Sequence, residues 1–301
     1  MLILIISLIS EVDYNAVIDK PKYINIAGRL LDLSIPKVMG VLNITPDSFY
    51  SGSRVTGEKE IIRIAENMLK EGADILDIGG YSSRPGAGDV SPGEEKKRAL
   101  GAIKLIHREF PDSILSIDTF RSDIAYEAVT NCGASVINDI SGGEADKNMF
   151  STVKSLNVPY IMMHMKGTPE NMQVDPVYDD VVADILQWLG NRIVNLRSAG
   201  VKDIIIDPGF GFGKTIKHNF ELLNRLGDFS VAGLPLMVGV SRKSMIWKTL
   251  EVSPEEALNG TTVLNTVALL KGADILRVHD VKEAVQCVKL ICMMRESEKK
   301  E

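Results

Sequence analysis

Polar side chains follow eight short apolar runs in the sequence, and these side chains are the ones best able to do chemistry. Taken one at a time, such residues are most often caps or turn formers. Four of them, Arg84, Lys243, Arg277 and His279, are cationic or can become so, which helix capping does not require. In chain order the residues are Asn43 with Thr45, Asp77 with Ser82 to Arg84, Asp118 with Thr119, Asn138 with Asp139, His164, Asp207, Ser241 to Lys243, and Arg277 with His279.

The mixture of charges predicts a ligand with two chemically different ends. Lys243 and Arg277 suit a phosphate or pyrophosphate, because charge-assisted hydrogen bonds to anionic oxygens are short and strong. Asp118, Asn138 and Asp207 suit a donor-rich group, since a carboxylate can pair with an amino group and an adjacent ring N–H. We therefore expect a flat heterocycle with a 2-amino-4-oxo edge that carries a phosphate or pyrophosphate.

The glycine-rich segment 207–215 comes close to two nucleotide-binding motifs and matches neither of them. The first glycine of a Walker phosphate loop falls at Pro208, and Gly209, Gly211 and Gly213 are spaced too closely for a dinucleotide fingerprint. We expect these glycines to let the backbone approach a ligand, with Phe212 as a ring-stacking surface. A plain flexible loop is the alternative.

The residue types exclude some classes of chemistry. His107 and His218 have no partner at zinc-ligand spacing, and neither a serine elbow nor a Cys/His dyad for covalent catalysis is evident. Mg²⁺ is compatible with the sequence, because it can bind through phosphate oxygens, water and one or two protein oxygens.

The elements that must position these residues alternate between strand and helix from residue 37 onward. Each apolar run is followed by a loop and an amphipathic helix, which predicts a parallel sheet. The expected strands are 38–42, 75–77, 114–117, 135–137, 160–163, 204–206, 236–240 and 275–278. The expected helices are 58–71, 94–109, 122–131, 146–156, 179–199, 218–227, 255–271 and 280–294. Ser-Pro-x-Glu segments at 91–94 and 253–256 mark two of the starts, and Gly72, Gly133, Gly200 and Gly272 mark stops.

Eight strand–helix units predict an α/β fold of the (β/α)8, or TIM, barrel type, whose active site lies at the carboxyl ends of the strands. An open doubly wound sheet would need a nucleotide fingerprint after an early strand, and the sequence has none. Residues 23–36 read as a short β-hairpin and 37–301 as one barrel domain. Residues 1–22 are expected to be an extension of uncertain structure.

Composition limits the partners and the compartment. The 301 residues contain 34 Lys and Arg and 40 Asp and Glu, a net charge of −6, which gives no global attraction for nucleic acid or an anionic membrane. Cys132, Cys287 and Cys292 form no CxxC pair, which favours a reducing, cytoplasmic location. The apolar run at 1–9 is too short for a membrane span and lacks the basic start and cleavage site of a signal peptide.

Seven motifs in this order closely resemble those of the dihydropteroate synthase family, the folate-pathway enzymes targeted by sulfonamides. The resemblance covers about residues 29–294. The motifs are V-L-N-I-T-P-D-S-F at 41–49, D-I-G-G at 77–80 with S-R-P-G-A at 83–87, S-I-D-T at 116–119, N-D-I-S-G at 138–142, D-P-G at 207–209 with G-F-G-K at 211–214, S-R-K at 241–243, and R-V-H-D at 277–280.

The resemblance implies a barrel enzyme that joins 6-hydroxymethyl-7,8-dihydropterin pyrophosphate to p-aminobenzoate and releases pyrophosphate. It also implies Mg²⁺ as a cofactor and a homodimer, with small molecules as the other partners and no nucleic acid or membrane. In the family, pyrophosphate departs first and leaves a carbocation at the pterin methylene, which the aromatic amine attacks.

The family's functional residues carry over to matching positions of this sequence. The expected catalytic residues are Asn43, Lys243, Arg277 and His279. The expected pterin-binding residues are Asp118, Asn138, Asp207 and Lys243. Pyrophosphate is expected at Asn43, Arg277 and His279, with Asn43 also a ligand of Mg²⁺. The p-aminobenzoate pocket is expected at Ser83, Arg84, Phe212 and Ser241.

Two loops depart from the family pattern. The second loop has Tyr81-Ser-Ser-Arg84 where the family often has Glu-Ser-Thr-Arg, and the first continues Tyr50-Ser-Gly-Ser53 instead of Ser-Asp-Gly-Gly.

Two other functions compete with the synthase. A pterin-binding methyltransferase serving a corrinoid protein would share the carboxylates without needing the pyrophosphate cluster, and a silent binding protein would keep the fold without turnover.

Overall fold

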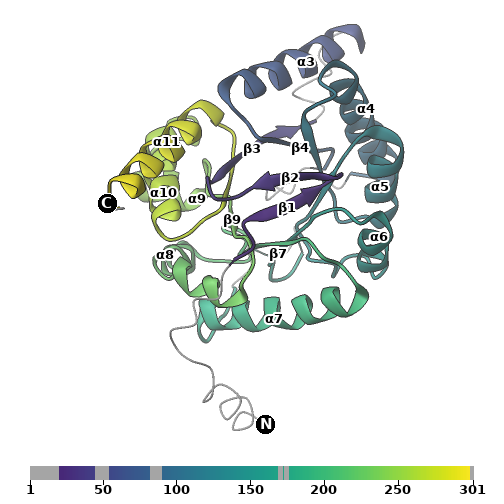
Figure 1. Cartoon of the computed structure of the whole chain (residues 1–301). Coiled ribbons are helices and arrows are strands. Elements are labelled where there is room, and N and C mark those ends of the chain that lie inside the picture. The colour runs from purple at the N-terminus through teal and green to yellow at the C-terminus, as the bar shows by residue number, and fades with distance from the viewer. Residues whose placement is uncertain (1–19, 45–53, 82–89, 169–171, 173–175, 299–301) are drawn as a thin grey trace.

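The structure is a computed structural model that describes residues 20–44, 54–81, 90–168, 172 and 176–298. Eight strands form one sheet in the order β8-β7-β6-β5-β4-β3-β10-β9, and every neighbouring pair in it is parallel. A parallel bridge between Ile206 and Leu236 joins the two ends of the sheet. Figure 1 shows the resulting ring of strands inside a ring of helices, which confirms the predicted barrel.

The barrel strands lie where the apolar runs predicted them, most of them one or two residues longer. Their bounds are β3 Lys37–Asn43, β4 Ile75–Gly79, β5 Ile114–Asp118, β6 Val136–Asp139, β7 Tyr160–Met163, β8 Ile204–Asp207, β9 Met237–Val238 and β10 Ile275–Val278. Strands β7 and β10 have the predicted bounds, and β9 is three residues shorter than the predicted 236–240.

The helices also follow the predicted order, with three differences. Their bounds are α3 Arg54–Glu71, α4 Pro92–Glu109, α5 Ser122–Glu127 continued by the π-helical turn η1 Ala128–Cys132, α6 Met149–Leu156, α7 Val181–Ala199, α8 Ile216–Asn224 followed by the 3₁₀ segment η2 Leu226–Ala232, α9 Ser244–Leu250, α10 Leu258–Leu270 and α11 Val281–Glu298. Helix α9 was not predicted from the sequence, and α5 with η1 and α8 with η2 were each predicted as one continuous helix.

The two Ser-Pro-x-Glu segments behave differently. Ser91 caps α4 as predicted, with its side chain accepting a hydrogen bond from the Glu94 N–H at 3.3 Å. At the second segment Glu256 accepts from the Ser253 N–H at 3.1 Å, but a turn follows and α10 begins only at Leu258. A helix start at 255 was therefore wrong, because half of a capping box can also close an isolated turn.

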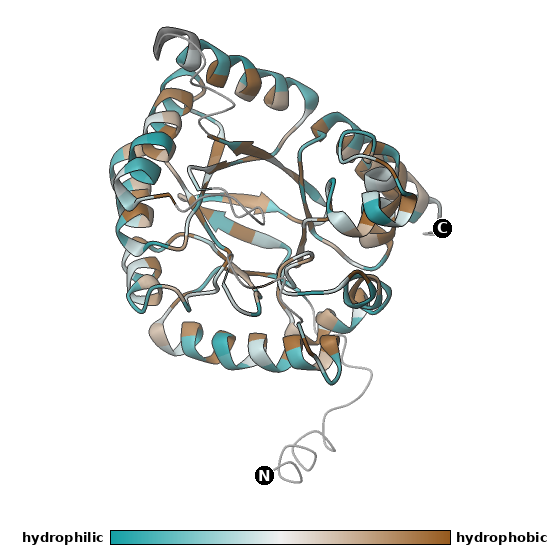
Figure 2. Ribbon diagram, turned by 180° about the vertical axis from the view of Figure 1, so that it is seen from behind, coloured by the Kyte–Doolittle hydropathy of each residue, from teal (hydrophilic) through white to brown (hydrophobic). Residues whose placement is uncertain are grey.

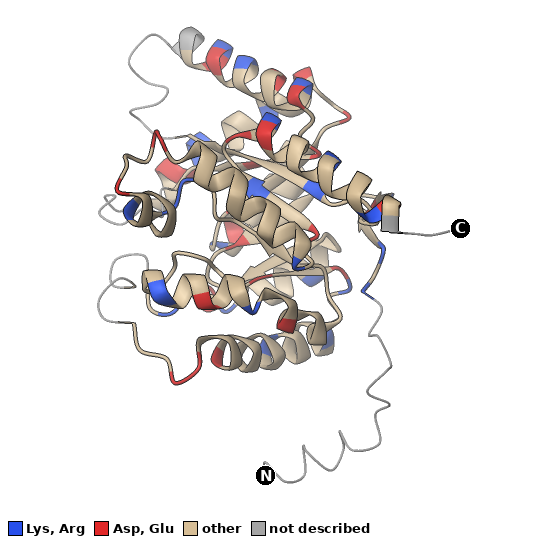
Figure 3. Ribbon diagram, turned by 90° about the vertical axis from the view of Figure 1, so that its left-hand side faces the viewer, with Lys and Arg blue, Asp and Glu red and all other residues tan. Residues whose placement is uncertain are grey.

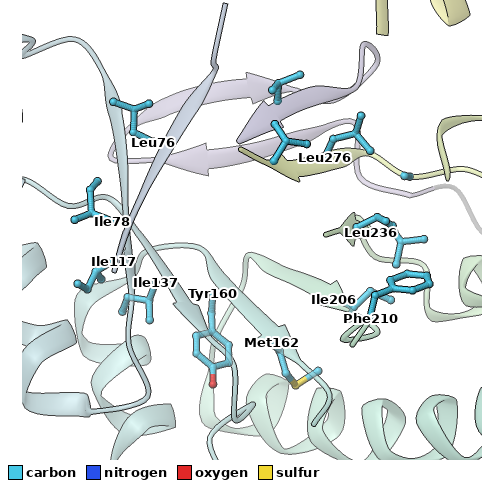
Figure 4. Packing of buried hydrophobic residues seen from close by; sticks show 14 of the residues in the cluster. Leu76, Ile78, Ile117, Ile137, Tyr160, Met162, Ile206, Phe210, Leu236 and Leu276 are labelled. Carbon is cyan, nitrogen blue, oxygen red and sulfur yellow. The ribbon is translucent and has the colours of Figure 1, made fainter. Parts of the chain in front are cut away.

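The outward side chains of the strands form the main core with the surrounding helices. Leu76, Ile137, Ile206 and Leu276 are fully or almost fully buried in this cluster, and Figure 4 shows them with their neighbours. The helices carry hydrophobic residues among hydrophilic ones (Figure 2), and Lys, Arg, Asp and Glu are intermingled over the outer helices (Figure 3).

The predicted β-hairpin is present, and it closes the amino-terminal end of the barrel, which the sequence did not indicate. Strand β1 (Tyr23–Ile26) pairs antiparallel with β2 (Arg29–Asp32), and in Figure 1 the hairpin lies across the centre of the ring. Buried Ile24, Ile26 and Leu33 pack against inward residues of the barrel. Those barrel residues are Met39, Ile75, Val136, Ile161, Ile205, Met237 and Ile275.

Residues 1–19, most of the predicted extension 1–22, lie outside the described part of the chain. None of the helices that the structure describes is long and apolar enough to cross a membrane.

The hairpin yields a stability prediction. Replacing Ile26 by Ala removes buried methyl groups from the barrel floor and should lower the free energy of unfolding by about 2–5 kcal/mol. Leu30→Ala, in the same hairpin but 68% exposed, should change it by no more than about 0.5 kcal/mol. Urea unfolding of both variants measures this, and equal effects would show that the hairpin does not seal the barrel.

Candidate active site

The two-residue period of the strands places a layer of polar side chains inside the barrel. Side chains at i and i+2 share a face of a strand, so residues 75, 136, 205 and 275 point inward to the hairpin. Two positions further on, still pointing inward, come Asp77, Asn138, Asp207 and Arg277. The polar residues therefore form the layer directly above the apolar floor, toward the carboxyl ends of the strands.

Arg277 binds two carboxylates in this layer. Its Nε donates to Asp77 Oδ2 at 2.7 Å and its Nη2 donates to Asp118 Oδ2 at 2.7 Å. Asn138 Nδ2 also donates to Asp77 Oδ2, at 2.9 Å. Asp77 Oδ1 and Ser116 Oγ are buried and have no hydrogen-bond partner among the described residues, so the layer retains unused hydrogen-bonding capacity.

Burial and charge pairing shift the titration of these groups. Burial raises the pKa of Asp118, and the Arg277 guanidinium opposes that rise. For Arg277, burial lowers the pKa, but Asp77 and Asp118 outweigh it and raise the value above the ordinary one. Arg277 is thus a permanent cation at the centre of the barrel.

Asp207 and Lys243 carry a second set of opposite charges in the site. Asp207 is buried and accepts a hydrogen bond from the Gly209 N–H at 2.7 Å. The Lys243 ammonium donates to the Phe210 carbonyl and lies 4.8 Å from the centre of the Phe212 ring, a cation–π contact. Burial lowers the pKa of Lys243 to about 8 and raises that of Asp207, while each group's charge opposes the shift of the other.

Ser241 and His279 form a separate pair at the mouth. Ser241 Oγ lies 3.1 Å from His279 Nδ1 and accepts the His279 backbone N–H at 3.2 Å. Arg242, between Ser241 and Lys243 in the sequence, points away from the site. It donates two hydrogen bonds, of 2.9 and 2.8 Å, to the Asp280 carboxylate. In the S-R-K motif, then, Ser241 and Lys243 face the site and the arginine holds the loop.

Asn43 lies at the end of β3, across Gly79 from Asp118. A β-carbon at Gly79 would lie 3.2 Å from Asn43 Oδ1, a tight approach, and 3.6 Å from Asp118 Oδ2, an ordinary contact distance. Among the described residues, no group of three His, Cys, Asp or Glu side chains could hold a metal ion. A single amide oxygen at the mouth does fit Mg²⁺ that arrives with phosphate oxygens and water as its other ligands.

The structure brings together most of the residues predicted from the sequence, though not always with the expected neighbours. Arg277 was expected with the pyrophosphate ligands, but its guanidinium contacts Asp118, an expected pterin ligand. Ser83 and Arg84, expected at the p-aminobenzoate pocket, lie outside the described residues. Asp77 was noted after its strand but not counted as a site residue, and only its inward register with Arg277 reveals its role.

The lysine of the glycine-rich segment has a structural role that the sequence did not reveal. Lys214 is 3% exposed and donates to the Gly209 and Phe212 carbonyls at 2.9 and 3.0 Å. Its ammonium is 3.0 Å from His164 Nδ1, and burial lowers the pKa of Lys214 well below its ordinary value. Burial also lowers the pKa of His164 to about 2, so the imidazole is neutral.

The same segment is too tightly packed to be a plain flexible loop. A β-carbon at Gly209, where φ is +73°, would lie 1.9 Å from the His164 carbonyl oxygen. Only glycine fits there, and its backbone N–H is the donor to Asp207. Lys214 and Gly209 together fix the segment that carries Phe212 toward Lys243.

Comparisons with known proteins agree with this site. Residues 39–279 match the family described as "Pterin binding enzyme". The chain is 41% identical over 266 residues to the dihydropteroate synthase of Escherichia coli K12, covering 88% of this chain and 93% of that protein.

Solved structures give the same result. The Yersinia pestis dihydropteroate synthase with a sulfonamide drug superposes with a TM-score of 0.85 and 38% identity, covering 92% of this chain and 100% of that one. The Xanthomonas albilineans enzyme in complex with 7,8-dihydropteroate gives 0.81 and 34%, covering 91% and 98%. With the sequence match over most of both chains, these likenesses show that the chain belongs to the dihydropteroate synthase family.

Proposed function

We propose that this protein synthesises 7,8-dihydropteroate from 6-hydroxymethyl-7,8-dihydropterin pyrophosphate and p-aminobenzoate in folate biosynthesis. The observation that carries the proposal is the buried polar layer, in which Arg277 pairs with Asp77 and Asp118 and the oppositely charged Asp207 and Lys243 interact electrostatically. A layer of fixed opposite charges suits a ligand that is rich in donors at one end and anionic at the other. The chain's membership of the family supports the same reaction.

The pterin would bind within this layer. Asp118, Asn138 and Asp207 supply acceptors for its amino group and ring N–H groups, and Lys243 supplies a donor for its carbonyl edge. The unpartnered Asp77 Oδ1 adds acceptor capacity at the same depth. Burial makes each of these bonds stronger than it would be in water.

The pyrophosphate would lie above the pterin, toward the mouth. Among the described residues, the Arg277 guanidinium uses Nε and Nη2 for the carboxylates, which leaves Nη1 to donate to a phosphate oxygen. His279 and Asn43 would complete this subsite, with Asn43 as a protein ligand of Mg²⁺. When bound, the metal ion would supply positive charge to the departing pyrophosphate.

The reaction would need no nucleophilic side chain. The C–O bond breaks as pyrophosphate leaves with the electron pair, and the p-aminobenzoate nitrogen then forms the C–N bond and loses a proton. Arg277, His279 and Lys243 stabilise charge on the leaving group and pterin carbonyl, while Asp118 and Asp207 offset the transient cation. Phe212, Ser241, Ser83 and Arg84 are the proposed p-aminobenzoate contacts.

An exposed apolar surface supports the further proposal of a homodimer. Helices α10 and α11 contact each other through Cys287, whose Sγ lies 3.6 Å from Thr266 Oγ1. Large hydrophobic side chains at helical spacing are exposed on these two helices. They are Val263, Leu270, Leu290, Met293 and Met294.

A second copy of the chain would bury this apolar surface. We also propose a cytoplasmic location, where the three free cysteines would stay reduced. Leu290→Asp, at a side chain that is 72% exposed, should give a monomer with unchanged helix content. Sedimentation velocity measures this, and a monomeric unsubstituted protein would refute the dimer.

The synthase reaction is tested with purified protein, the two substrates and Mg²⁺. Dihydropteroate and pyrophosphate should appear in equal amounts. Methyl transfer from methyltetrahydrofolate to a corrinoid, or pterin binding without turnover, would support one of the two competing functions instead. The 41% identity to a curated synthase over 266 residues favours the synthase over both.

Asp207→Asn should weaken pterin binding by about 100-fold, because a neutral amide cannot accept two charge-assisted hydrogen bonds from the amino and ring N–H groups. Isothermal titration of the free pterin measures the loss. Asp139→Asn is the matched control, since Asp139 is equally buried but faces Ser141 and Tyr160 instead of the layer. Asp139→Asn should lower the free energy of unfolding and leave pterin affinity within about threefold of the original. If both variants lost the same affinity for pterin, the proposed role of Asp207 would be contradicted.

The lowered pKa of Lys243, about 8, predicts the alkaline limb of the activity profile. Below that pH the ammonium is present, and as pH rises through it the proton is lost, so kcat/KM for the pterin substrate should fall about tenfold per unit. In Lys243→Arg the guanidinium stays protonated, and the limb should disappear even if activity is lower. A limb that persists unchanged in this variant would assign the titration to another group.

A further inference from the structure

An ion pair joins two of the loops that follow the barrel strands. Arg242 lies between β9 and α9, and Asp280 lies between β10 and α11. Arg242 Nε donates to Asp280 Oδ2 at 2.9 Å, and Arg242 Nη2 donates to Asp280 Oδ1 at 2.8 Å. Two parallel bonds between a guanidinium and a carboxylate fix the relative orientation of the two groups as well as their distance. The Arg242–Asp280 pair therefore holds the loop after β9 in a defined position against the end of β10.

A third segment, the one that leads into α10, also holds Arg242. Arg242 Nη1 donates to the carbonyls of Pro254 and Glu255, at 3.0 and 2.6 Å. The backbone N–H of Arg242 donates to Oγ1 of Thr261, a residue of α10 that is 2% exposed. With four hydrogen bonds from the guanidinium, the arginine has little freedom to change its conformation.

The backbone at Arg242 has an uncommon conformation. Its φ of +53° lies in the left-handed region, which is unfavourable for a residue with a β-carbon. Such a conformation persists where surrounding contacts impose it, and it is frequent at functional sites. Here it falls between Ser241 and Lys243, the two residues of the loop that face the site. The contacts of Arg242 thus determine the path of the chain that carries both of them.

The same two loops are joined a second time, inside the site. Ser241 precedes Arg242, and His279 precedes Asp280. Ser241 Oγ lies 3.1 Å from His279 Nδ1 and accepts the His279 backbone N–H at 3.2 Å. The Arg242–Asp280 pair therefore lies directly beside the Ser241–His279 contact and can fix its geometry from outside the site.

We propose that Arg242 is a positioning residue that, through Asp280, holds His279 and Ser241 where they stabilise the departing pyrophosphate. The inference rests on the proposed function, because that function assigns His279 to the pyrophosphate subsite. Arg242 acts through its neighbours and not as a charge on the substrate, since it points away from the site and Asp280 neutralises it.

Kinetics and pterin titration of Arg242→Gln test the proposal. The kcat should fall about 10- to 100-fold, because a small displacement of the groups that act on the leaving group is costly. The dissociation constant of the free pterin should stay within about threefold, because the proposed acceptors for the pterin lie on β5, β6 and β8. An unchanged kcat, or a loss of pterin affinity as large as the loss of kcat, would overturn the proposal.

Substitutions of both partners separate geometry from charge. Arg242→Lys keeps the charge without the two parallel bonds and should recover less than about a third of the lost kcat. Asp280→Asn keeps the size of the side chain and should lower kcat to a similar extent, which also tests the pair if Arg242→Gln does not fold. The double variant Arg242→Gln/Asp280→Asn should be within about threefold of Arg242→Gln, because both changes remove one interaction. Full recovery by lysine, or losses that multiply in the double variant, would refute the role of the pair.

Arg63→Gln is the matched control. Arg63 and Glu60 form an ion pair with the same two-bond geometry, 2.8 and 2.6 Å, but both residues belong to the single helix α3. Loss of this exposed pair should leave kcat within about twofold of the original. A fall in kcat as large as that of Arg242→Gln would show that the loss of any such pair suffices, and would overturn the proposal.

NMR of the imidazole nitrogens provides a readout that does not need the enzymatic activity. The chain has four histidines, so the His279 signals can be assigned by their loss in His279→Gln. In Arg242→Gln they should shift toward the positions that they take in Ser241→Ala, with the signals of His107 unchanged. The same shift in a protein that makes no dihydropteroate would refute the proposed function and keep the effect of Arg242 on His279. Unshifted His279 signals would refute the positioning role itself.

Discussion

The pairing of Arg277 with Asp77 and Asp118 inside the barrel is the interaction on which the site depends. Three charged groups in a buried layer are tolerated only because each lies within hydrogen-bond distance of a partner of opposite charge. The strands that carry them are β4, β5 and β10, so one guanidinium ties together segments up to 200 residues apart in sequence. The polar layer is therefore part of what holds the barrel together as well as a place to bind a ligand.

The fold produces this layer through the alternation of side chains along each strand. Leu76, Ile137, Ile206 and Leu276 point to the helices, while the residues on either side of each point into the barrel. The lower inward residue is apolar and the upper one polar at four of the strands. A one-residue shift of register would exchange core and site, which is why the pattern is so strongly specified.

Much of this could be predicted from local sequence, and what could not depends on distant partners. Apolar runs ending in polar residues were enough to predict the barrel and to nominate Asp118, Asn138, Asp207 and Lys243. Nothing local distinguishes a lysine that reaches a ligand from one, like Lys214, that turns inward to hold its own loop. The contacts of Arg277 and the short helix α9, which has no side-chain cap, likewise follow from the assembled barrel.

The hairpin below the polar layer affects how substrates enter the barrel and how the product leaves it. Among the described residues, Ile24 and Ile26 pack into the opposite end of the barrel and close it, which leaves the mouth as the route to the layer. Under the proposed assignment the molecule that occupies the deeper position must enter before the one that sits above it. A compulsory order of addition, and release of the joined product back along the same route, then follow from a blind-ended barrel.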